Sequence, residues 1–256
     1  MKKFLTMSLV AMIGMVMTSC MSVNIGNSAK DDTPTQVPEA NKVTAMQPFD
    51  EVSIAGGFNV FYEQGDSHSV RIEAPETAIN EMTVYVKGDE LRIRQSVKKN
   101  TFSFSKVKIF VTSPDIKSIE LAGSGMFAAK NRINVSGDLD AEVAGSGSIL
   151  LVDVACKEVE MSIAGSGNIE IGRITPQNAS AKIAGSGNII LEEMTCAEFD
   201  IEIAGSGDVN CANITADDVH TEIAGSGDVN LTGMVKNHTK SVAGSGKVNI
   251  VEPKAE

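Results

Sequence analysis

The chain of 256 residues is poor in aromatic and basic side chains. It has no tryptophan and two tyrosines, and aromatic residues make up 4% of it, so a platform of stacked rings for sugars is not indicated. Its 22 lysines and arginines stand against 33 aspartates and glutamates, which gives a net charge of −11. Nucleic acids and anionic lipids bind basic surfaces, so neither is an expected partner.

Histidines are equally scarce. The three of them, His68, His220 and His238, show neither HxxxH spacing nor the order of a Ser-His-Asp triad. We expect His68 in a turn, His220 at an outward strand position and His238 in a terminal cap. The sequence therefore predicts no catalytic residue and no cofactor, and the chain is not expected to be an enzyme.

The longest apolar run lies at the start of the chain. Two lysines precede the apolar segment 4–17, which is too short for a spanning helix and typical of an export signal. The segment ends in Met17-Thr18-Ser19-Cys20, which resembles a bacterial lipobox. This pattern predicts a lipoprotein signal peptide over residues 1–19, acylation of Cys20 and a lipid anchor in the outer membrane of the cell envelope. Ordinary secretion with a free Cys20 thiol is the alternative.

Two segments of different composition follow the predicted signal peptide. Residues 20–48 are polar, contain three prolines and lack periodicity, which predicts a flexible tether. Short segments of alternating polar and apolar residues then fill 49–120 and are typical of strands. Among them, Lys87-Gly88-Asp89-Glu90 predicts a hairpin turn with Gly88 at positive φ. The longest candidate helix is the stretch 75–82.

The second half of the chain repeats the tetrapeptide Ala-Gly-Ser-Gly. It occurs seven times, starting at residues 122, 144, 164, 184, 204, 224 and 243. Counted from the first glycine of each copy, the positions two, four and six residues before it, and four, six and nine after it, are mostly apolar. A period of two fits half-buried strands and does not fit one face of a helix. Each repeat therefore predicts a strand, a sharp turn, a second strand and a looser return.

The nearly constant spacing favours a β-solenoid, because each coil must return in register above the previous one. We predict an all-β domain over 49–252, with irregular coils over 49–120 and regular coils of about 20 residues over 121–252. An antiparallel hairpin ladder is the alternative. The glycines of the sharp turns, which tolerate backbone angles that a Cβ would forbid, are Gly145, Gly147, Gly165, Gly167, Gly185, Gly187, Gly205, Gly207, Gly225, Gly227, Gly244 and Gly246.

Stacking makes further predictions about particular side chains. Met194 and Met234 both fall in the apolar column nine residues after the first glycine. In the last repeat, His238 and Lys240 replace apolar residues, which predicts a C-terminal cap. Residues two coils apart lie about 9.6 Å from each other, beyond the reach of a disulfide. We therefore expect three free cysteines that are buried or half-buried, namely Cys156, Cys196 and Cys211.

Acidic columns are the main chemical signal in the repeats. Stacking places Asp208 beside Asp228 after the turn, and Glu202 beside Glu222 before it, at about 5 Å. Carboxylates this close repel each other, and a raised pKa, water or Ca²⁺ would relieve the repulsion. No metal site is predicted, since a solvated acidic face explains the same columns, and these four residues are the only candidates for one. Paired carboxylates also cleave glycosides in some enzymes.

Three sequence features resemble the auto-transporter adhesin head domain, also called the GIN domain, a family common among lipoproteins and secreted proteins of gut bacteria. They are Ile-Ala-Gly-Gly-Phe-Asn-Val at 54–60 with Gln-Gly-Asp at 64–66, Val-Lys-Gly-Asp-Glu-Leu-Arg-Ile at 86–93, and the Ala-Gly-Ser-Gly-Asn/Asp series. The resemblance covers about residues 49–251. It implies a β-helix similar to the pectin-lyase architecture, without an established catalytic apparatus, and a role in adhesion.

The sequence therefore predicts a non-catalytic, lipid-anchored β-solenoid of the cell envelope. Such a protein would bind an unknown protein or glycan partner through a repetitive face. Two alternatives stay open at this point: a polysaccharide-active β-helix enzyme, and a scaffold whose coils associate into homo-oligomers.

Overall fold

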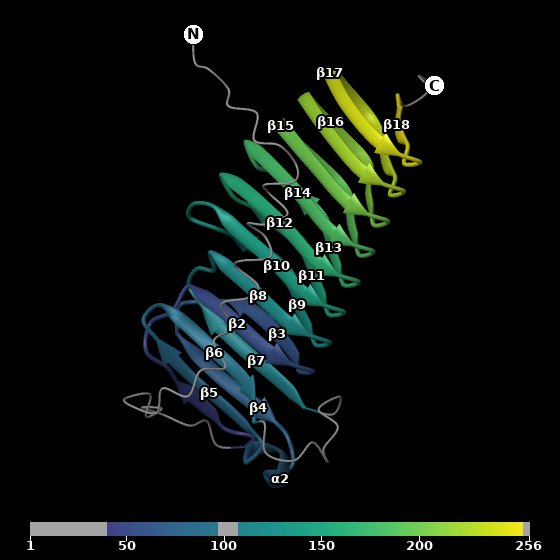
Figure 1. Cartoon of the computed structure of the whole chain (residues 1–256). Helices are drawn as coiled ribbons and strands as arrows, with labels where there is room; N and C mark the ends of the chain where they lie inside the picture. Colours follow the sequence, from purple (N-terminus) through teal and green to yellow (C-terminus); the bar gives the residue numbers. More distant parts are fainter. Residues whose placement is uncertain (1–39, 97–106, 253–256) are drawn as a thin grey trace. The chain divides into compact units, whose positions relative to one another are not determined.

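The chain forms a β-solenoid of about seven turns in which parallel bridges join residues about 20 positions apart (Figure 1). The computed structural model describes residues 40–96 and 107–252, so the predicted signal peptide 1–19 and Cys20 lie outside the described residues. The all-β solenoid predicted from the repeats is confirmed. Within the described part of the chain, no helix is both long and apolar enough to cross a membrane.

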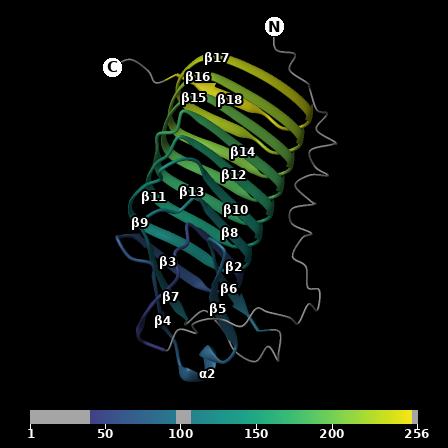
Figure 2. The ribbon, with the colours of Figure 1, turned by 90° about the vertical axis from the view of Figure 1, so that its left-hand side faces the viewer.

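The strands that precede each Gly-Ser-Gly corner, or its equivalent in the earlier coils, stack in parallel. We call the surface they form the pre-corner face (Figure 2). Its members are β2 (Glu51–Gly56), β6 (Glu90–Gln95), β8 (Ser118–Gly123), β10 (Leu139–Gly145), β12 (Glu158–Gly165), β14 (Asn178–Gly185) and the later parts of β15 (Asn188–Gly205), β16 (Asp208–Gly225) and β17 (Val229–Gly244).

The strands that follow each corner stack in the same way and form the post-corner face. Its members are β3 (Asn59–Gln64), β7 (Lys108–Ser113), β9 (Met126–Asn134), β11 (Ser148–Ala155), β13 (Asn168–Ile174), the first parts of β15, β16 and β17, and β18 (Val248–Val251). Because both faces keep the same coil order, side chains at equivalent positions line up along the solenoid axis.

The corners themselves stack one on another through backbone contacts. The Ser186 amide donates a hydrogen bond to the carbonyl oxygen of Gly165 in the coil below, at 2.8 Å, and the same contact recurs at the other corners. The first glycine of each corner has a φ between 125° and 143° in Gly145, Gly165, Gly185, Gly205, Gly225 and Gly244. The second glycines, such as Gly187, leave no room for a β-carbon against the corner below. The glycines predicted to make the sharp turns therefore occupy them.

The core is a set of apolar columns enclosed between the two faces. Ile163, Ile183 and Ile203 stack in register two residues before the corner, and all three are buried. The columns four and six residues before the corner are buried in the same way from the coil of Leu139 to the coil of Val219, with Thr221 as the polar member. The period-two pattern in the sequence thus predicts which side chains face inward.

The prediction for Met234 is wrong. Its side chain is 62% exposed, whereas Met194, at the same position of an earlier repeat, is buried. The register between β16 and β17 shifts after Cys211, so that Ile214 pairs with Gly233 instead of Met234. The last repeat is one residue shorter than the others, and the lost residue turns Met234 outward.

The first coil in the sequence is not the first coil in the stack. Strands β2 and β3 lie between the coil of β6 and β7 and the coil of β8 and β9, as their parallel pairings on both sides require (Figure 1). Gly56, with a φ of 140°, pairs with Gly123 and belongs to the same column of corners. The chain therefore builds outward from β2–β3 in one direction and then in the other.

Antiparallel strands close the N-terminal end of the stack. Strand β5 (Met82–Lys87) pairs with β6, and β4 (Ser69–Glu73) pairs with β7, next to the short helix α2 (Glu76–Ile79). The turn between β5 and β6 has Gly88 at a φ of 65°, as predicted. Strand β1 (Val43–Ala45) pairs with β4. The predicted tether 20–48 is thus wrong for these three residues, because alternating side chains over so short a stretch leave no periodicity to detect.

At the C-terminal end of the stack, polar residues interrupt the apolar columns, as predicted for the cap. His238 and Lys240 lie in register with Val219 and Thr221, positions that are buried one coil earlier. In this last coil Lys240 is exposed and His238 half-buried, while Val242 is 40% exposed. Polar side chains at the end of these columns lower the apolar area left open to water.

Candidate functional site

One outward column of side chains runs along the whole post-corner face and changes its chemistry on the way. It starts with aromatic residues near the N-terminal end, continues with mainly apolar residues and ends in asparagines. In stacking order the column is Phe110, Phe61, Ala128, Leu150, Glu170, Ile190, Asn210, Asn230 and Asn249. Its first two thirds form the floor of a hollow, which makes this column the candidate binding site.

An aromatic pair occupies the first end of the column. The rings of Phe61 and Phe110 stack with centroids 5.4 Å apart and an angle of 26° between their planes. The guanidinium of Arg71 lies over the Phe110 ring at 3.9 Å from its centroid, in cation–π geometry. Both phenylalanines are half-buried. The low aromatic content of the chain gave no indication of this pair.

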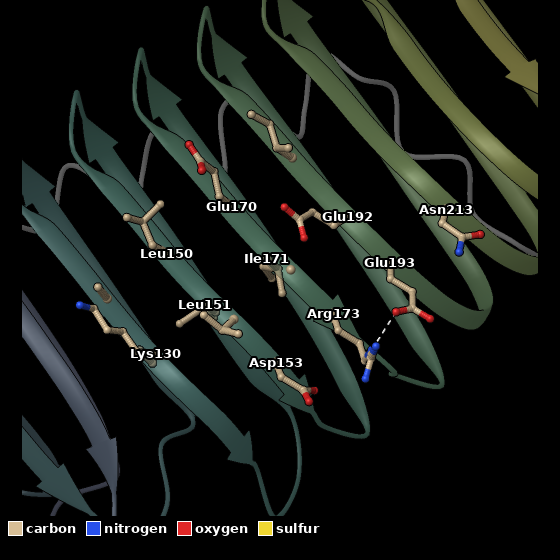
Figure 3. Close-up of a pocket in the computed structure, with 15 residues that line it drawn as sticks. Lys130, Leu150, Leu151, Asp153, Glu170, Ile171, Arg173, Glu192, Glu193 and Asn213 are labelled. Atoms are coloured by element: carbon tan, nitrogen blue, oxygen red, sulfur yellow. Dashed lines mark hydrogen bonds and ion pairs between the residues drawn. The ribbon is translucent and has the colours of Figure 1, made fainter.

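Two adjoining hollows cover this column. The first, of about 450 Å³, includes Phe61 and Phe110, and the second, of about 750 Å³, extends to Ile190; both are bordered by Ala128 and Lys130. Figure 3 shows the second hollow, with Leu150 and Glu170 side by side on neighbouring strands. We call the two hollows together the outer groove. Its shape suits an extended ligand that lies along the solenoid axis, since it crosses several coils.

A bend in the strands deepens the outer groove. Pairing between β9 and β11 is interrupted where Lys130 and Asn131 together oppose Val152, which is a β-bulge, and Val152 is 53% exposed. In the next coil the equivalent residue is Gly172, where a β-carbon would stand 2.6 Å from the Val152 carbonyl oxygen. A side chain at Gly172 would therefore collide with the backbone of β11.

Charges of alternating sign form one rim of the outer groove. Arg132, Asp153, Arg173 and Glu193 follow one another in register. The Arg132 and Asp153 side chains form an ion pair at 3.3 Å, and Arg173 Nε donates to the Glu193 carboxylate at 2.8 Å (Figure 3). These four side chains are balanced in charge, whereas the lining of the second hollow also includes Glu170 and Glu192 and is therefore acidic.

The asparagine end of the column is a ladder of side-chain hydrogen bonds. The Asn230 amide donates to Asn210 Oδ1 at 2.9 Å, and the Asn249 amide donates to Asn230 Oδ1 at 2.8 Å. These bonds occupy the polar atoms that would otherwise face a ligand. The ladder therefore stabilises the last coils and marks the end of the groove.

The Asp208 and Asp228 side chains accept hydrogen bonds from the backbone of the next coil. Asp208 Oδ1 accepts a hydrogen bond from the Asp228 amide at 2.8 Å, and Asp228 Oδ1 accepts one from the Lys247 amide at 2.8 Å. In the coil below, Asn188 Oδ1 accepts from the Asp208 amide at 3.3 Å. Each side chain thus binds a backbone amide just after the next corner, which gives this column a role without a metal ion.

Glu202 and Glu222 lie on the other side of the corner, next to each other on the pre-corner face. Burial raises the pKa of the Glu202 carboxyl, Lys182 opposes this shift, and Glu222 adds to it. The four acidic candidates therefore form two separate columns on different faces. Repulsion between neighbouring carboxylates is present as expected, and the structure brings no more than two of the four into one place.

The three histidines lie in different environments. His68 packs edge-on against Phe49 with ring centroids 5.3 Å apart. His238 Nε2 lies 3.4 Å from Thr221 Oγ1, and burial, with Lys240 and His220 nearby, lowers the pKa of the His238 imidazole. His220 points outward on the pre-corner face near Glu198, at 3.5 Å.

The three cysteines of the solenoid are free, as predicted. Cys196 and Cys211 are buried and Cys156 is half-buried. Burial raises the pKa of the Cys156 and Cys196 thiols to about 12 and that of Cys211 to about 11. At neutral pH these thiols are protonated, so they are poor nucleophiles and poor metal ligands.

Comparison with protein families supports the resemblance found in the sequence. A family model described as "Putative auto-transporter adhesin, head GIN domain" matches residues 48–212 and 179–256. These two ranges overlap and together cover most of the chain. No protein of curated function matches the chain in sequence.

Several solved structures share this fold. A "putative adhesin" from Bacteroides fragilis superposes with a TM-score of 0.74 at 21% identity, and one from Parabacteroides merdae with 0.68 at 21%. A "putative lipid binding protein" from Parabacteroides distasonis superposes with 0.57 at 24%. Each comparison covers 82% of this chain and 95% of the other. At these identities the likeness shows the fold alone.

Proposed function

We propose, from the premise that this chain belongs to the auto-transporter adhesin head GIN domain family, that it is a non-catalytic adhesin-like protein of the cell envelope that binds a partner through the outer groove. The partner is an extended glycan or protein segment outside the cell or in the envelope. The adhesin names of the family and of the structural neighbours support the general role.

One observation carries the proposal. The stacked Phe61 and Phe110 rings open directly into a groove whose apolar floor continues over Ala128 and Leu150. Glu170 interrupts this floor before Ile190, which is 37% exposed. Rings and aliphatic side chains on a solvent-exposed sheet offer apolar area that water does not favour, and the alternating rim adds polar contacts at its side. Exposed apolar side chains gathered over successive coils are typical of a binding face.

The proposal includes anchoring through Cys20. The apolar run and the lipobox-like Met17-Thr18-Ser19-Cys20 support a lipid anchor, and the acidic charge of the chain disfavours binding to anionic lipid surfaces by charge alone. Replacement of Cys20 by serine should move the protein from the membrane pellet to the soluble fraction. Protease treatment of intact cells then tells whether the solenoid faces the outside. A Cys20→Ser protein that stays in the pellet would contradict the anchor.

The binding proposal is tested with the purified mature protein on an array of bacterial and host surface glycans and proteins. We expect retention of at least one ligand class, and a loss of retention of at least tenfold in the double variant Phe61→Ser, Phe110→Ser. The matched control is Met234→Ser, which also removes an exposed apolar side chain but lies outside the groove. Equal retention by both variants would contradict binding through the groove.

The same experiment separates the two alternatives. Cleavage of a retained polysaccharide would indicate an enzyme, for which the carboxylate columns were the motivation. An increase of particle size with concentration, without retention of any ligand, would indicate a scaffold of homo-oligomers. Retention without cleavage by a protein of constant size is the outcome that the proposed function requires.

A further inference from the structure

We infer that Glu198, Asp200 and His220 form a binding site for a divalent transition-metal ion of the zinc class. The site lies on the pre-corner face, near the C-terminal end of the solenoid, whereas the outer groove lies on the post-corner face. It does not rest on the proposed adhesin role, and its ligands differ from the acidic residues singled out by the repeats.

The strand register brings the three side chains together. Glu198 and Asp200 are two residues apart in β15 and therefore point to the same side of the sheet. His220, on the neighbouring strand β16, pairs directly with Asp200. One ligand atom from each of the three residues lies within 4.8 Å of the others. Rigid strands of two adjacent coils thus supply all three donors.

The distances match the needs of a small divalent ion. His220 Nε2 lies 3.5 Å from Glu198 Oε1. Zinc binds nitrogen and oxygen at about 2.0–2.2 Å in tetrahedral geometry, which places neighbouring ligand atoms about 3.4 Å apart. The two donors therefore already stand at the separation of two zinc ligands. Small rotations of the exposed Glu198 and Asp200 side chains complete the set.

A third coil orients the histidine ring. His220 Nδ1 lies 2.6 Å from Thr239 Oγ1 in β17, so Nδ1–H donates to this hydroxyl when Nε2 binds a metal ion. Metal-binding histidines are usually held in this way, because a partner on the second ring nitrogen selects the tautomer and the ring orientation. Thr239 thus leaves Nε2 facing the two carboxylates.

A bound cation would neutralise the two carboxylates at this place. Elsewhere on the surface, Glu160 pairs with Lys182, Glu193 with Arg173 and Asp217 with Lys236. Among the described residues, neither Glu198 nor Asp200 forms an ion pair with a lysine or arginine. The basic side chain that contacts Glu198 is the His220 imidazole, which is uncharged when it binds a metal ion.

The donor set selects the class of metal. Calcium and magnesium prefer oxygen ligands alone, whereas one imidazole nitrogen with two carboxylate oxygens suits zinc, cobalt or nickel. Three protein ligands leave a position for water, as in sites that are not purely structural. The cysteines do not compete, because the Cys196 and Cys211 thiols are buried in the core.

The test is isothermal titration of the purified mature protein with ZnCl₂, and in parallel with CaCl₂. We expect one zinc ion per chain and at least tenfold weaker calcium binding. The variants His220→Ala and Glu198→Gln should each weaken zinc binding at least tenfold, and Thr239→Val by a smaller factor of about ten or less, since it acts only through the ring orientation.

The matched control is His238→Ala, which removes a histidine from the next coil and should bind zinc as the unchanged protein does. Circular dichroism melting confirms that the variants are folded, and X-ray absorption at the zinc edge should show one imidazole with oxygen neighbours and no sulfur. Absence of zinc binding, unchanged affinity in His220→Ala, or a sulfur ligand would each overturn the assignment.

Discussion

Gly185 lies directly above Gly165 in the stack of corners, and a β-carbon built on Gly185 would stand 2.2 Å from the Gly165 carbonyl oxygen. The same oxygen accepts the Ser186 amide at 2.8 Å. The contact that joins two coils therefore requires a residue without a side chain. It explains why the corner sequence is repeated with so little change.

Gly185→Ala should lower the free energy of unfolding by about 2–4 kcal/mol, because a φ of 135° and a backbone clash must both be relieved. Gly88→Ala is the control: Gly88 also has a positive φ, but a β-carbon there would meet nothing within 4 Å. We expect a loss of about 1 kcal/mol for this variant. Urea unfolding followed by circular dichroism measures the free energy of unfolding of both variants. Equal losses of stability would show that the close stacking of the corners does not explain the cost of Gly185→Ala.

The regular coils were predictable from the sequence because the inward or outward direction of each side chain follows a period of two, and a slip of one residue would expose the whole apolar set. The corner glycines add a fixed point in every coil. Stacking then follows from the constant repeat length, as the register of Ile163, Ile183 and Ile203 shows.

The aromatic end of the outer groove could not be predicted from the sequence in this way. Phe61 and Phe110 become neighbours only because β3 and β7 pair, although other strands separate them in the sequence. That pairing depends on the insertion of the β2–β3 coil between the β6–β7 coil and the β8–β9 coil, for which the chain carries no local pattern. The one available signal was an outward phenylalanine in each of two strands whose inward residues are apolar.

Stability should rise as the pH falls from 7 toward 4.5. Burial, together with the neighbouring Glu142, raises the pKa of the Glu120 carboxyl above its ordinary value, and burial raises the pKa of the Asp140 carboxyl. A raised pKa means that the folded chain binds the proton more tightly than the unfolded chain, so this contribution is lost as the pH rises through the folded-state pKa. Thermal melting at a series of pH values checks the direction.

Glu120→Gln should stabilise the protein at pH 7 by about 0.5–1 kcal/mol, because it removes one of two like charges that face each other across β8 and β10. It should also flatten the pH dependence. Glu193→Gln, which removes an acid paired with Arg173, should instead be neutral or slightly destabilising. A destabilised Glu120→Gln variant would mean that the hydrogen bond between Glu120 and Ser53 outweighs the repulsion.

Loss of charge at Asp208 and Asp228 should not destabilise the protein. In Asp208→Asn, Asp228→Asn the side-chain oxygens still accept the amide hydrogen bonds, as Asn188 does in the coil below. The melting temperature should be unchanged or higher. Asp208→Ala should cost about 1 kcal/mol, since the Asp228 amide loses its partner. If the double asparagine variant loses both stability and a response to calcium, the column is a metal site after all.

Met194 and Met234 occupy the same position of their repeats, yet the first is 1% exposed and the second 62%. The shorter last repeat places Gly233 opposite Ile214, where a β-carbon would lie 2.0 Å from the Ile214 carbonyl oxygen. Met194→Ala should therefore cost about 2–4 kcal/mol through the cavity it leaves, whereas Met234→Ala should change stability by less than about 0.5 kcal/mol. Urea midpoints of the two variants decide the matter: similar losses would mean that Met234 returns to the core and that the register shift after Cys211 is absent in solution.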